Sequence, residues 1–261
     1  FSFCVPYSRP LSLHLTVRNG PVDRAGLQQL LMAADAHRPA ILQDNDLVGV
    51  GDGAHPLGDD EHRRAAHIFA QAGARLSHLA QQAMRAGLAG LEFAAGIPGS
   101  VGGAVAMNAG AYGGQISDVL EEARVAMDGK IAVFPREAME FGYRTSLPLA
   151  RKLVVAGARF RLHRDDPAAI AARMADFAQR RREKQPLSLP SAGSVFKRPE
   201  GHFAGALIEG AGLKGLRVGG AQVSEKHAGF IVNTGGATAA DVLALVETIR
   251  ARVREKYGVE L

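Results

Sequence analysis

A segment rich in small residues, from Gly87 to Gly114, constrains the fold more than any other part of this 261-residue chain. Its sequence is GLAGLEFAAGIPGSVGGAVAMNAGAYGG. Glycine adopts unusual backbone angles and leaves space for a ligand against the main chain. Backbone N–H groups in such a run, with the side chains of Ser100, Asn108 and Tyr112, suit a pyrophosphate that lies across a turn. We interpret the segment as a cradle for a nucleotide cofactor; a tightly packed Gly/Ala turn without a ligand is the alternative.

Several common catalytic and nucleotide-binding motifs are missing from the sequence. No G-x-G-x-x-G opens a helix within a βαβ unit, so the glycine-rich segment is not a Rossmann fingerprint. No G-x-S-x-G elbow, Walker loop or metal-spaced set of His and Asp is present. The sequence therefore gives no support for a nucleophile-elbow hydrolase, for phosphoryl transfer or for zinc chemistry, and we expect no metal site.

The composition is that of a globular protein with more than one domain. A chain of this length is expected to form two or three domains, and its 47% hydrophobic and 22% charged residues are ordinary for such a protein. The single cysteine, Cys4, excludes an internal disulfide framework and suits a reducing cytoplasm. The net charge of +5 suits an anionic ligand. We expect no nucleic-acid partner, because no basic stripe is interleaved with aromatic residues, and no membrane insertion, because no apolar run is long enough.

Periodicity and turn signals predict the secondary structure. In the first part of the chain we predict a helix over Asp23–His37, a short apolar stretch at Ala40–Leu42 and a loop over Gln43–Asp52. Further along we predict a strand at 66–73, a helix at 75–86, a hairpin of strands 123–128 and 130–135 with its turn at Asp128-Gly129, a strand at 153–163, a helix from Pro167 to about Arg182, and a helix from Thr238 to Tyr257 with a Thr238/Asp241 capping box. The charged linker at Asp165-Asp166-Pro167 is the predicted domain boundary.

Two short segments outside the glycine run carry side chains suited to chemistry. FGYRTS places Tyr143 beside Arg144, whose guanidinium suits a carboxylate or phosphate; an ordinary surface arginine is the alternative. SAGSVFKRP presents Ser194 after a glycine, where its hydroxyl would either donate a proton or only cap the backbone.

Lys184 and His227, near these segments, each have two possible interpretations. Lys184, shortly before the serine segment, could bind an anion, although its cluster RRREK is equally the solvated end of a helix. VGGAQVSEKHAGFIVN holds His227 between two apolar strands, and such a histidine is more often structural than catalytic.

In this order, the segments resemble the UDP-N-acetylenolpyruvoylglucosamine reductase (MurB) family of bacterial peptidoglycan synthesis, in its shorter form without an inserted tyrosine loop. The resemblance runs from about Ala72 to Leu261 and rests on GLEFAAGIPGSVGGAVAMNAGAYG, FGYRTS, KQPLSLPSAGSVFK, FAGALIEGAGLKG and GGAQVSEKHAGFIVN. It implies an α+β fold, in which a two-subdomain FAD-binding domain of the vanillyl-alcohol oxidase/MurB type precedes an α+β C-terminal domain. The implied boundaries are 1–60 and 61–164 for the FAD-binding subdomains and 165–261 for the substrate-binding domain.

The resemblance also implies an activity. NADPH reduces bound FAD, and the flavin passes hydride to the enolpyruvyl double bond of UDP-N-acetylglucosamine enolpyruvate, which gives UDP-N-acetylmuramate. The implied enzyme is a cytoplasmic monomer that serves cell-wall synthesis and cell division, with the UDP-sugar enolpyruvyl ether and NADPH as its partners.

The family's functional residues carry over to matching positions. Arg144 matches the arginine that stabilises the enolate charge, and Ser194 matches the serine that donates the proton. The resemblance implies substrate contacts from Tyr143, Lys184, Lys197 and His227. It implies cofactor contacts from the glycine run, at Ile97, Pro98, Gly99, Ser100, Gly102, Gly103, Asn108, Gly110 and Tyr112.

Two stretches depart from the family pattern. The first subdomain reads LTVRNGPVD and LQDNDLVGVGDG where the family has a TFRxGGPA-like stretch and a GxGSN loop, so the first flavin loop is divergent. The family places a catalytic glutamate just beyond the position of Leu261, where the printed sequence ends, and we expect slow turnover without it. A catalytically weak or inactive relative that binds a UDP-sugar or nucleotide is therefore the alternative function.

Overall fold

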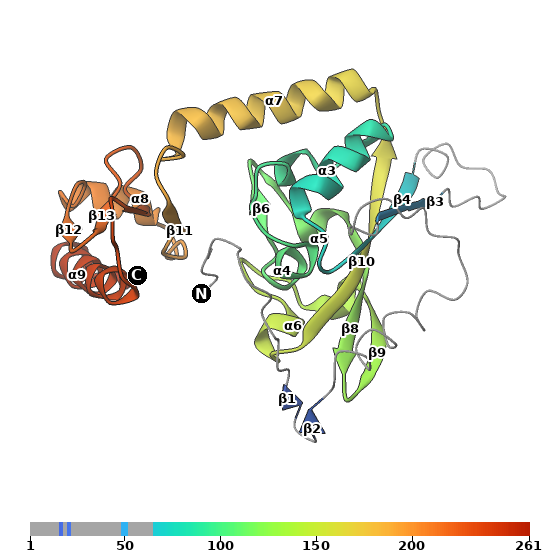
Figure 1. The fold of residues 1–261 in the computed structure, drawn as a ribbon, viewed down its shortest axis with the longest axis horizontal. Helices are drawn as coiled ribbons and strands as arrows, with labels where there is room; N and C mark the ends of the chain where they lie inside the picture. Colours follow the sequence, from blue (N-terminus) through green and yellow to red (C-terminus); the bar gives the residue numbers. More distant parts are fainter. Residues whose placement is uncertain (1–15, 18–19, 22–47, 52–64) are drawn as a thin grey trace. The chain divides into compact units, whose positions relative to one another are not determined.

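The computed structural model describes residues 16–17, 20–21, 48–51 and 65–261 of the chain (Figure 1). The helix expected over Asp23–His37 and the apolar stretch at Ala40–Leu42 lie outside the described residues. From residue 65 onward the chain falls into two compact units, which part between Ala178 and Gln179. Each unit has its own sheet and its own buried core.

The first unit is built on an antiparallel sheet with the strand order β3-β4-β10-β8-β9, and β5 pairs with the end of β10. The strands are β3 (Val48–Gly51), β4 (Ala65–Gln71), β5 (Leu88–Ala89), β8 (Leu120–Met127), β9 (Lys130–Pro135) and β10 (Val154–Arg164). Two short pairs accompany this sheet: β1 (Thr16–Val17) with β2 (Gly20–Pro21), and β6 (Gly110–Ala111) with β7 (Gly114–Gln115).

One sequence expectation in this sheet is wrong. The stretch Gln43–Asp52 was expected to be loop, yet Val48–Gly51 forms strand β3 and pairs with β4. Two glycines in VGVG weaken the local strand signal, and strand formation depends on cross-strand partners that local sequence does not reveal. The other predicted strands of this unit are confirmed, as β4, β8, β9 and β10.

The hairpin between β8 and β9 is confirmed together with its turn. Asp128 and Gly129 have φ angles of 50° and 73°, and Met127 pairs with Lys130 across them. Two consecutive positive φ angles define the type I′ turn that suits the twist of a hairpin. Asp-Gly is a favoured pair for this turn, and therefore the local sequence was sufficient here.

The core of the first unit lies between the sheet and short helices. β10 buries Val155, Ala158, Phe160 and Leu162. The helices and 3-10 turns of this unit are α3 (Leu76–Arg85), η1 (Glu92–Ala94), α4 (Val101–Ala106), α5 (Ile116–Val119), η2 (Arg136–Met139) and α6 (Leu147–Ala150). The helix predicted at 75–86 is confirmed as α3, which begins after the extended residue Arg75 and buries Leu76, Leu79, Ala80 and Ala83.

Helix α7 (Pro167–Lys184) follows β10 and confirms the predicted helix, including its start at a proline and its basic last turn. Proline suits the first helical position because its missing N–H would have no partner there. The predicted domain boundary at 164/165 stays a prediction. No helix among the described residues combines the length and apolar character that crossing a membrane requires.

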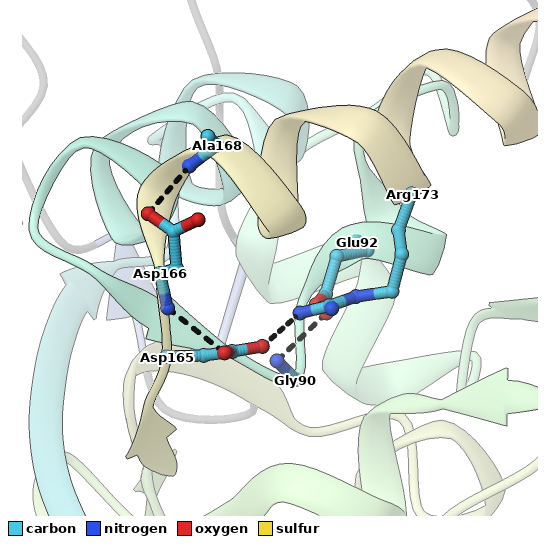
Figure 2. A network of polar contacts seen from close by, with 6 residues as sticks. All are labelled: Gly90, Glu92, Asp165, Asp166, Ala168 and Arg173. Carbon is cyan, nitrogen blue, oxygen red and sulfur yellow. Dashed lines mark hydrogen bonds and ion pairs between the residues drawn. The ribbon is translucent and has the colours of Figure 1, made fainter.

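An ionic network fastens the first half of α7 to the glycine-rich segment, as Figure 2 shows. Arg173 Nη2 lies 2.6 Å from Asp165 Oδ2 and 2.8 Å from Glu92 Oε1, and Gly90 donates its N–H to Glu92 Oε2 at 2.7 Å. The hydrogen bond from Arg173, followed by the N–H of Asp166, lowers the pKa of Asp165 below its ordinary value of 3.8. The network holds together two segments that are far apart in the sequence, Gly90–Glu92 and Asp165–Arg173.

The second unit has a four-stranded antiparallel sheet with the order β11-β14-β13-β12, and its core includes residues from two helices. Its elements are β11 (Ser191–Ser194), α8 (Ala204–Gly210), β12 (Arg217–Val218), β13 (Ala221–Val223), β14 (Phe230–Asn233) and α9 (Ala239–Tyr257). The predicted capping box is confirmed: Thr238 Oγ1 accepts from Asp241 N at 3.1 Å, and Asp241 Oδ2 accepts from Thr238 N at 2.9 Å.

Candidate active site

The glycines of the segment 87–114 differ in what an added Cβ would meet. At Gly102, Gly110 and Gly114 an added Cβ would meet protein atoms at 2.7–2.8 Å, so these glycines serve close packing. An added Cβ at Gly99 would meet nothing within 4 Å, and at Gly103 only Ser100 Oγ at 3.4 Å. The φ of 133° already favours glycine at Gly99, whereas neither packing nor backbone conformation accounts for glycine at Gly103, where there is room for a ligand.

The start of α4 uses most of its own amide donors. Gly103 N donates to Ser100 Oγ at 3.2 Å, Gly102 N donates to Ala72 O at 3.0 Å, and Val101 N donates to Ala74 O at 2.9 Å. Among the described residues, the N–H groups of Gly99 and Ser100 have no hydrogen-bond partner. Two adjacent free amides beside open space fit the phosphate oxygens of a nucleotide cofactor.

Tyr112 lies at the tip of the hairpin formed by β6 and β7, at the far end of the same segment. Its φ is 53° and that of the next residue, Gly113, is 88°. The Tyr112 ring stacks on the ring of Phe177 from α7. The remaining predicted cofactor contacts precede α4: Ile97 packs partly against the core, and Pro98 is exposed.

Asn108 differs from its neighbours in the segment because its side chain is turned to protein. The residue is 2% exposed and has a φ of 43°. Its Oδ1 accepts from Ser117 N at 3.0 Å, and its Nδ2 donates to Gly142 O at 3.0 Å. A contact between Asn108 and a cofactor would therefore come from the backbone, and the side chain serves a neighbouring turn.

That neighbouring turn carries Arg144. Gly142 and Thr145 bond to each other across it, and Tyr143 and Arg144 are its two central residues. Arg144 has a φ of 56°, which an arginine rarely adopts. Its Nη1 donates to Asn108 O at 3.0 Å and its Nη2 to Gly110 O at 2.6 Å. A guanidinium has five N–H donors, so three remain for an anion within the described part of the chain.

The structure thus brings Arg144 onto the glycine-rich segment. Tyr143 lies beside it, 51% exposed, with the Arg144 guanidinium 5.1 Å from its ring centroid. The placement of a long cationic side chain against this segment is consistent with a site for anionic ligands.

In the second unit, Ser194 ends strand β11 and is exposed. Pairing with β14 shifts register between Ser191 and Ser194, and Gly193 between them has a φ of 79°. Ser191 shapes this bulge, because its Oγ accepts from Gly193 N at 2.8 Å and donates to Ile231 O at 3.0 Å. Among the described residues, the Ser194 hydroxyl has no hydrogen-bond partner, so it is free to donate.

His227 lies in the loop between β13 and β14. Its Nδ1 accepts from Gly229 N at 3.1 Å, which leaves the proton of a neutral imidazole on Nε2. The ring meets Phe230 edge-on, with centroids 4.9 Å apart. A Cβ on Gly229 would lie 3.1 Å from His227 Cε1 and 3.7 Å from Ser194 Oγ, so Gly229 keeps the space between these two side chains open.

The predicted substrate lysines are both exposed. Lys184 is the last residue of α7, and Lys197 follows β11. Lys226 was not singled out from the sequence, although its Nζ donates to the carbonyl of Arg182 in the last turn of α7. A cation at this position suits the negative end of a helix dipole.

Comparisons with known proteins identify the family. The model of the UDP-N-acetylenolpyruvoylglucosamine reductase C-terminal domain matches residues 185–261, and an FAD binding domain model matches residues 58–133. The crystal structure of UDP-N-acetylenolpyruvylglucosamine reductase (MurB) from Thermus caldophilus is 45% identical, with a TM-score of 0.66 over 74% of this chain and 70% of that chain. This chain belongs to the UDP-N-acetylenolpyruvoylglucosamine reductase (MurB) family. Its fold is accordingly α+β, with an FAD-binding type of domain followed by the MurB C-terminal domain.

Curated MurB relatives agree with this assignment. The UDP-N-acetylenolpyruvoylglucosamine reductase of Syntrophomonas wolfei is 56% identical over 195 residues, which are 74% of this chain and 65% of the relative. That of Clostridium botulinum (strain 657 / Type Ba4) is 53% identical over 195 residues, which are 74% of this chain and 64% of the relative. The matched part thus spans slightly less than two thirds of the length of these MurB relatives.

Sequence reasoning missed two serines that lie beside the predicted site residues. Ser146 Oγ donates to Ala106 O at 2.7 Å and is 1% exposed, and Ser191 shapes the bulge before Ser194. Ser146 is the N-cap of the short helix α6, with Pro148 two residues later, and this capping pattern was the signal that could have drawn attention to it. The bonds of Asn108 and Arg144 join residues 34–36 positions apart, and no local pattern encodes them.

Proposed function

We propose that this chain binds FAD in the glycine-rich segment and catalyses the NADPH-driven reduction of UDP-N-acetylglucosamine enolpyruvate to UDP-N-acetylmuramate, a step of peptidoglycan precursor synthesis. The observation that carries the proposal is the anchoring of Arg144 on two carbonyls of this segment, at Asn108 and Gly110. An anion-binding group fixed beside a cofactor cradle is what a reduction with a charged intermediate requires. Membership of the MurB family supports the same activity.

The residues that fit FAD lie around the start of α4 and along the segment that follows. We propose the contacts Ile97, Pro98, Gly99, Ser100, Gly102, Gly103, Asn108, Gly110 and Tyr112. The open space at Gly99 and Gly103, and the free amides of Gly99 and Ser100, support a phosphate contact there. When bound, FAD supplies a carrier that accepts hydride from NADPH and passes it to the enolpyruvyl double bond.

Arg144 and Ser194 act on the substrate in this proposal. Hydride addition to the double bond leaves an enolate that is conjugated with the substrate carboxylate. The three remaining N–H donors of Arg144 stabilise this negative charge, and the hydroxyl of Ser194 donates the proton that completes the reduction. The free state of the Ser194 hydroxyl supports a donor role, because no other acceptor competes for its proton among the described residues.

Tyr143, Lys184, Lys197 and His227 are proposed to bind the nucleotide-sugar. Both lysines are exposed cations that suit the diphosphate, and the Nε2–H of His227 is a donor. We further propose the domain division 1–60, 61–164 and 165–261, and a cytoplasmic monomer. Sedimentation of the chain at assay concentration would test the monomer.

The test of the function is a reconstituted reaction. The chain is titrated with FAD, freed of unbound FAD, and mixed with NADPH and the enolpyruvyl substrate. We expect a bound flavin spectrum, oxidation of NADPH that depends on the substrate, and a product two hydrogen atoms heavier by mass spectrometry. A chain that binds the UDP-sugar but neither retains FAD nor forms this product would instead be a catalytically inactive relative.

A further inference from the structure

Three alternate carbonyls of the glycine-rich segment accept hydrogen bonds from one other segment, residues 142–146. Ala106 O accepts from Ser146 Oγ at 2.7 Å, and Asn108 O and Gly110 O accept from the two terminal nitrogens of Arg144. These bonds fix where the guanidinium lies only if the backbone of the turn at Gly142–Thr145 is itself fixed.

One of the two hydrogen bonds that close this turn is long. Gly142 N donates to Thr145 O at 3.1 Å, but the return bond from Thr145 N to Gly142 O is 3.4 Å long. Arg144 at its centre has a φ of 56°, a conformation that costs roughly 1–2 kcal/mol for a residue with a Cβ. Such a turn relaxes unless surrounding structure holds it.

The side chain of Asn108 provides a further hydrogen bond that holds this turn. Its Nδ2 donates to Gly142 O at 3.0 Å, whereas the bond that Thr145 N donates to the same oxygen is 3.4 Å long. Its Oδ1 is anchored by Ser117 N at 3.0 Å, and the residue is 2% exposed. Asn108 therefore acts on Arg144 in two ways. Its side chain hydrogen-bonds to the first residue of the turn, and its backbone carbonyl accepts a hydrogen bond from the Arg144 guanidinium.

We propose that Asn108 is a positioning residue that holds the Arg144 guanidinium against the glycine-rich segment. This role differs from a contact with the cofactor, and the catalytic consequence rests on the proposed reductase function. Without the Asn108 amide, Gly142 O loses its hydrogen bond from Asn108, and the turn is free to relax. Arg144 then exchanges between orientations in which fewer of its donors meet the substrate enolate.

The first test measures the position of Arg144 in the full-length chain by NMR of arginine guanidinium groups, with and without FAD. Asn108→Gly is the informative variant, because glycine accepts the φ of 43° and keeps the backbone carbonyl while the amide is lost. Ser146→Ala is the matched control: it also removes a buried bond between the same two segments but leaves Gly142 held.

We expect the Nη signals of Arg144 to be separate in the unaltered chain and in Ser146→Ala, since two carbonyls hold its two terminal nitrogens. In Asn108→Gly these signals should merge through rotation of the guanidinium. Separate signals in Asn108→Gly, or merged signals in the unaltered chain, would overturn the positioning role. This measurement decides the proposal even if the chain proves to have no reductase activity.

The second test is a double-mutant cycle on the rate at which the enolpyruvyl substrate reoxidises the reduced flavin, at saturating FAD. Asn108→Gly should slow this step by about 10–100-fold, the scale expected for a misplaced catalytic group. In an Arg144→Ala background the same change should cost less than about twofold. Equal losses in both backgrounds would mean that Asn108 does not act through Arg144.

Discussion

The rings of Tyr112 and Phe177 stack with their centroids 4.8 Å apart and an interplanar angle of 5°. Tyr112 lies in the turn of the β6–β7 hairpin at the end of the glycine-rich segment, and Phe177 belongs to α7. Together with the Arg173–Glu92 ion pair, the stack ties α7 to that segment at two points. The helix that follows the sheet therefore also shapes the proposed cofactor site.

Loss of the stack should weaken FAD binding without unfolding the chain. We expect Phe177→Ala to raise the Kd for FAD by about 2–10-fold, since an aromatic pair contributes about 0.5–1.5 kcal/mol beyond its buried area. Phe177→Tyr keeps the stack and should bind FAD as the unaltered chain does. Quenching of flavin fluorescence measures both, and an unchanged Kd in Phe177→Ala would show that the hairpin tip does not contribute to FAD binding.

Two adjacent glycines offer a matched test of the cradle. Gly103→Ala has space for its methyl group and improves a helix position by about 0.5–1 kcal/mol, so the Tm of the FAD-free chain should hold or rise while FAD affinity falls. Gly102→Ala would place its Cβ 2.8 Å from Ala72 Cβ, so its Tm should fall even without FAD. Normal FAD affinity in Gly103→Ala would remove Gly103 from the site.

Ser194→Ala should separate the two halves of the reaction. The reduction of the flavin by NADPH should be nearly unchanged, whereas its reoxidation by the enolpyruvyl substrate should slow by about 10²–10⁴-fold, because the proton is needed only in that half. The exposed Ser188, changed to Ala, is the control. Stopped-flow absorbance follows both steps, and equal slowing of the two would assign Ser194 a structural role.

The capping box of α9 predicts a loss of stability in acid. Hydrogen bonds from the N–H groups of Thr238 and Gly220 lower the pKa of Asp241 below its ordinary value of 3.8. A lowered carboxyl pKa gives stability that is present above the unfolded-state pKa and disappears as the pH falls through the folded-state pKa.

Asp241→Asn should therefore lower the Tm at pH 7, and the difference from the unaltered chain should shrink as the pH falls below about 4. Glu255→Gln, in the same helix with its side chain 75% exposed, serves as the control and should change the Tm little. A Tm difference for Asp241→Asn that stays constant down to pH 2 would show that the carboxylate charge does not stabilise the cap.

The elements that local sequence predicted are those with local causes. Asp128-Gly129 forms a type I′ turn because both residues tolerate a positive φ, and Thr238 with Asp241 closes a box within one helical turn. Strand β3 was missed because its stability comes from pairing with β4. In the site, sequence motifs named Arg144 but could not show that two carbonyls hold it, since that depends on how distant segments pack.

The positive φ angles of Asn108, Tyr112 and Arg144 escaped prediction for a related reason. Propensity assigns that conformation to glycine, and the segment has many glycines to which it could be assigned. At these three larger residues, the positive φ is accompanied by tertiary hydrogen bonds or by the aromatic stack. The sequence indicated which segment matters, and the packing decided which side chains it presents.

The central claim, that Arg144 serves a flavin-dependent reduction, is tested most directly by single-turnover absorbance of the FAD-loaded chain in the absence of oxygen. NADPH should bleach the flavin band, and the enolpyruvyl substrate should restore it. In Arg144→Ala, NADPH should still bleach the flavin band, but restoration of the band by the enolpyruvyl substrate should slow by at least about 100-fold. This is the usual effect of removing one group that stabilises transition-state charge. Restoration at the unaltered rate in Arg144→Ala, or an unaltered chain whose flavin the substrate never reoxidises, would contradict the account.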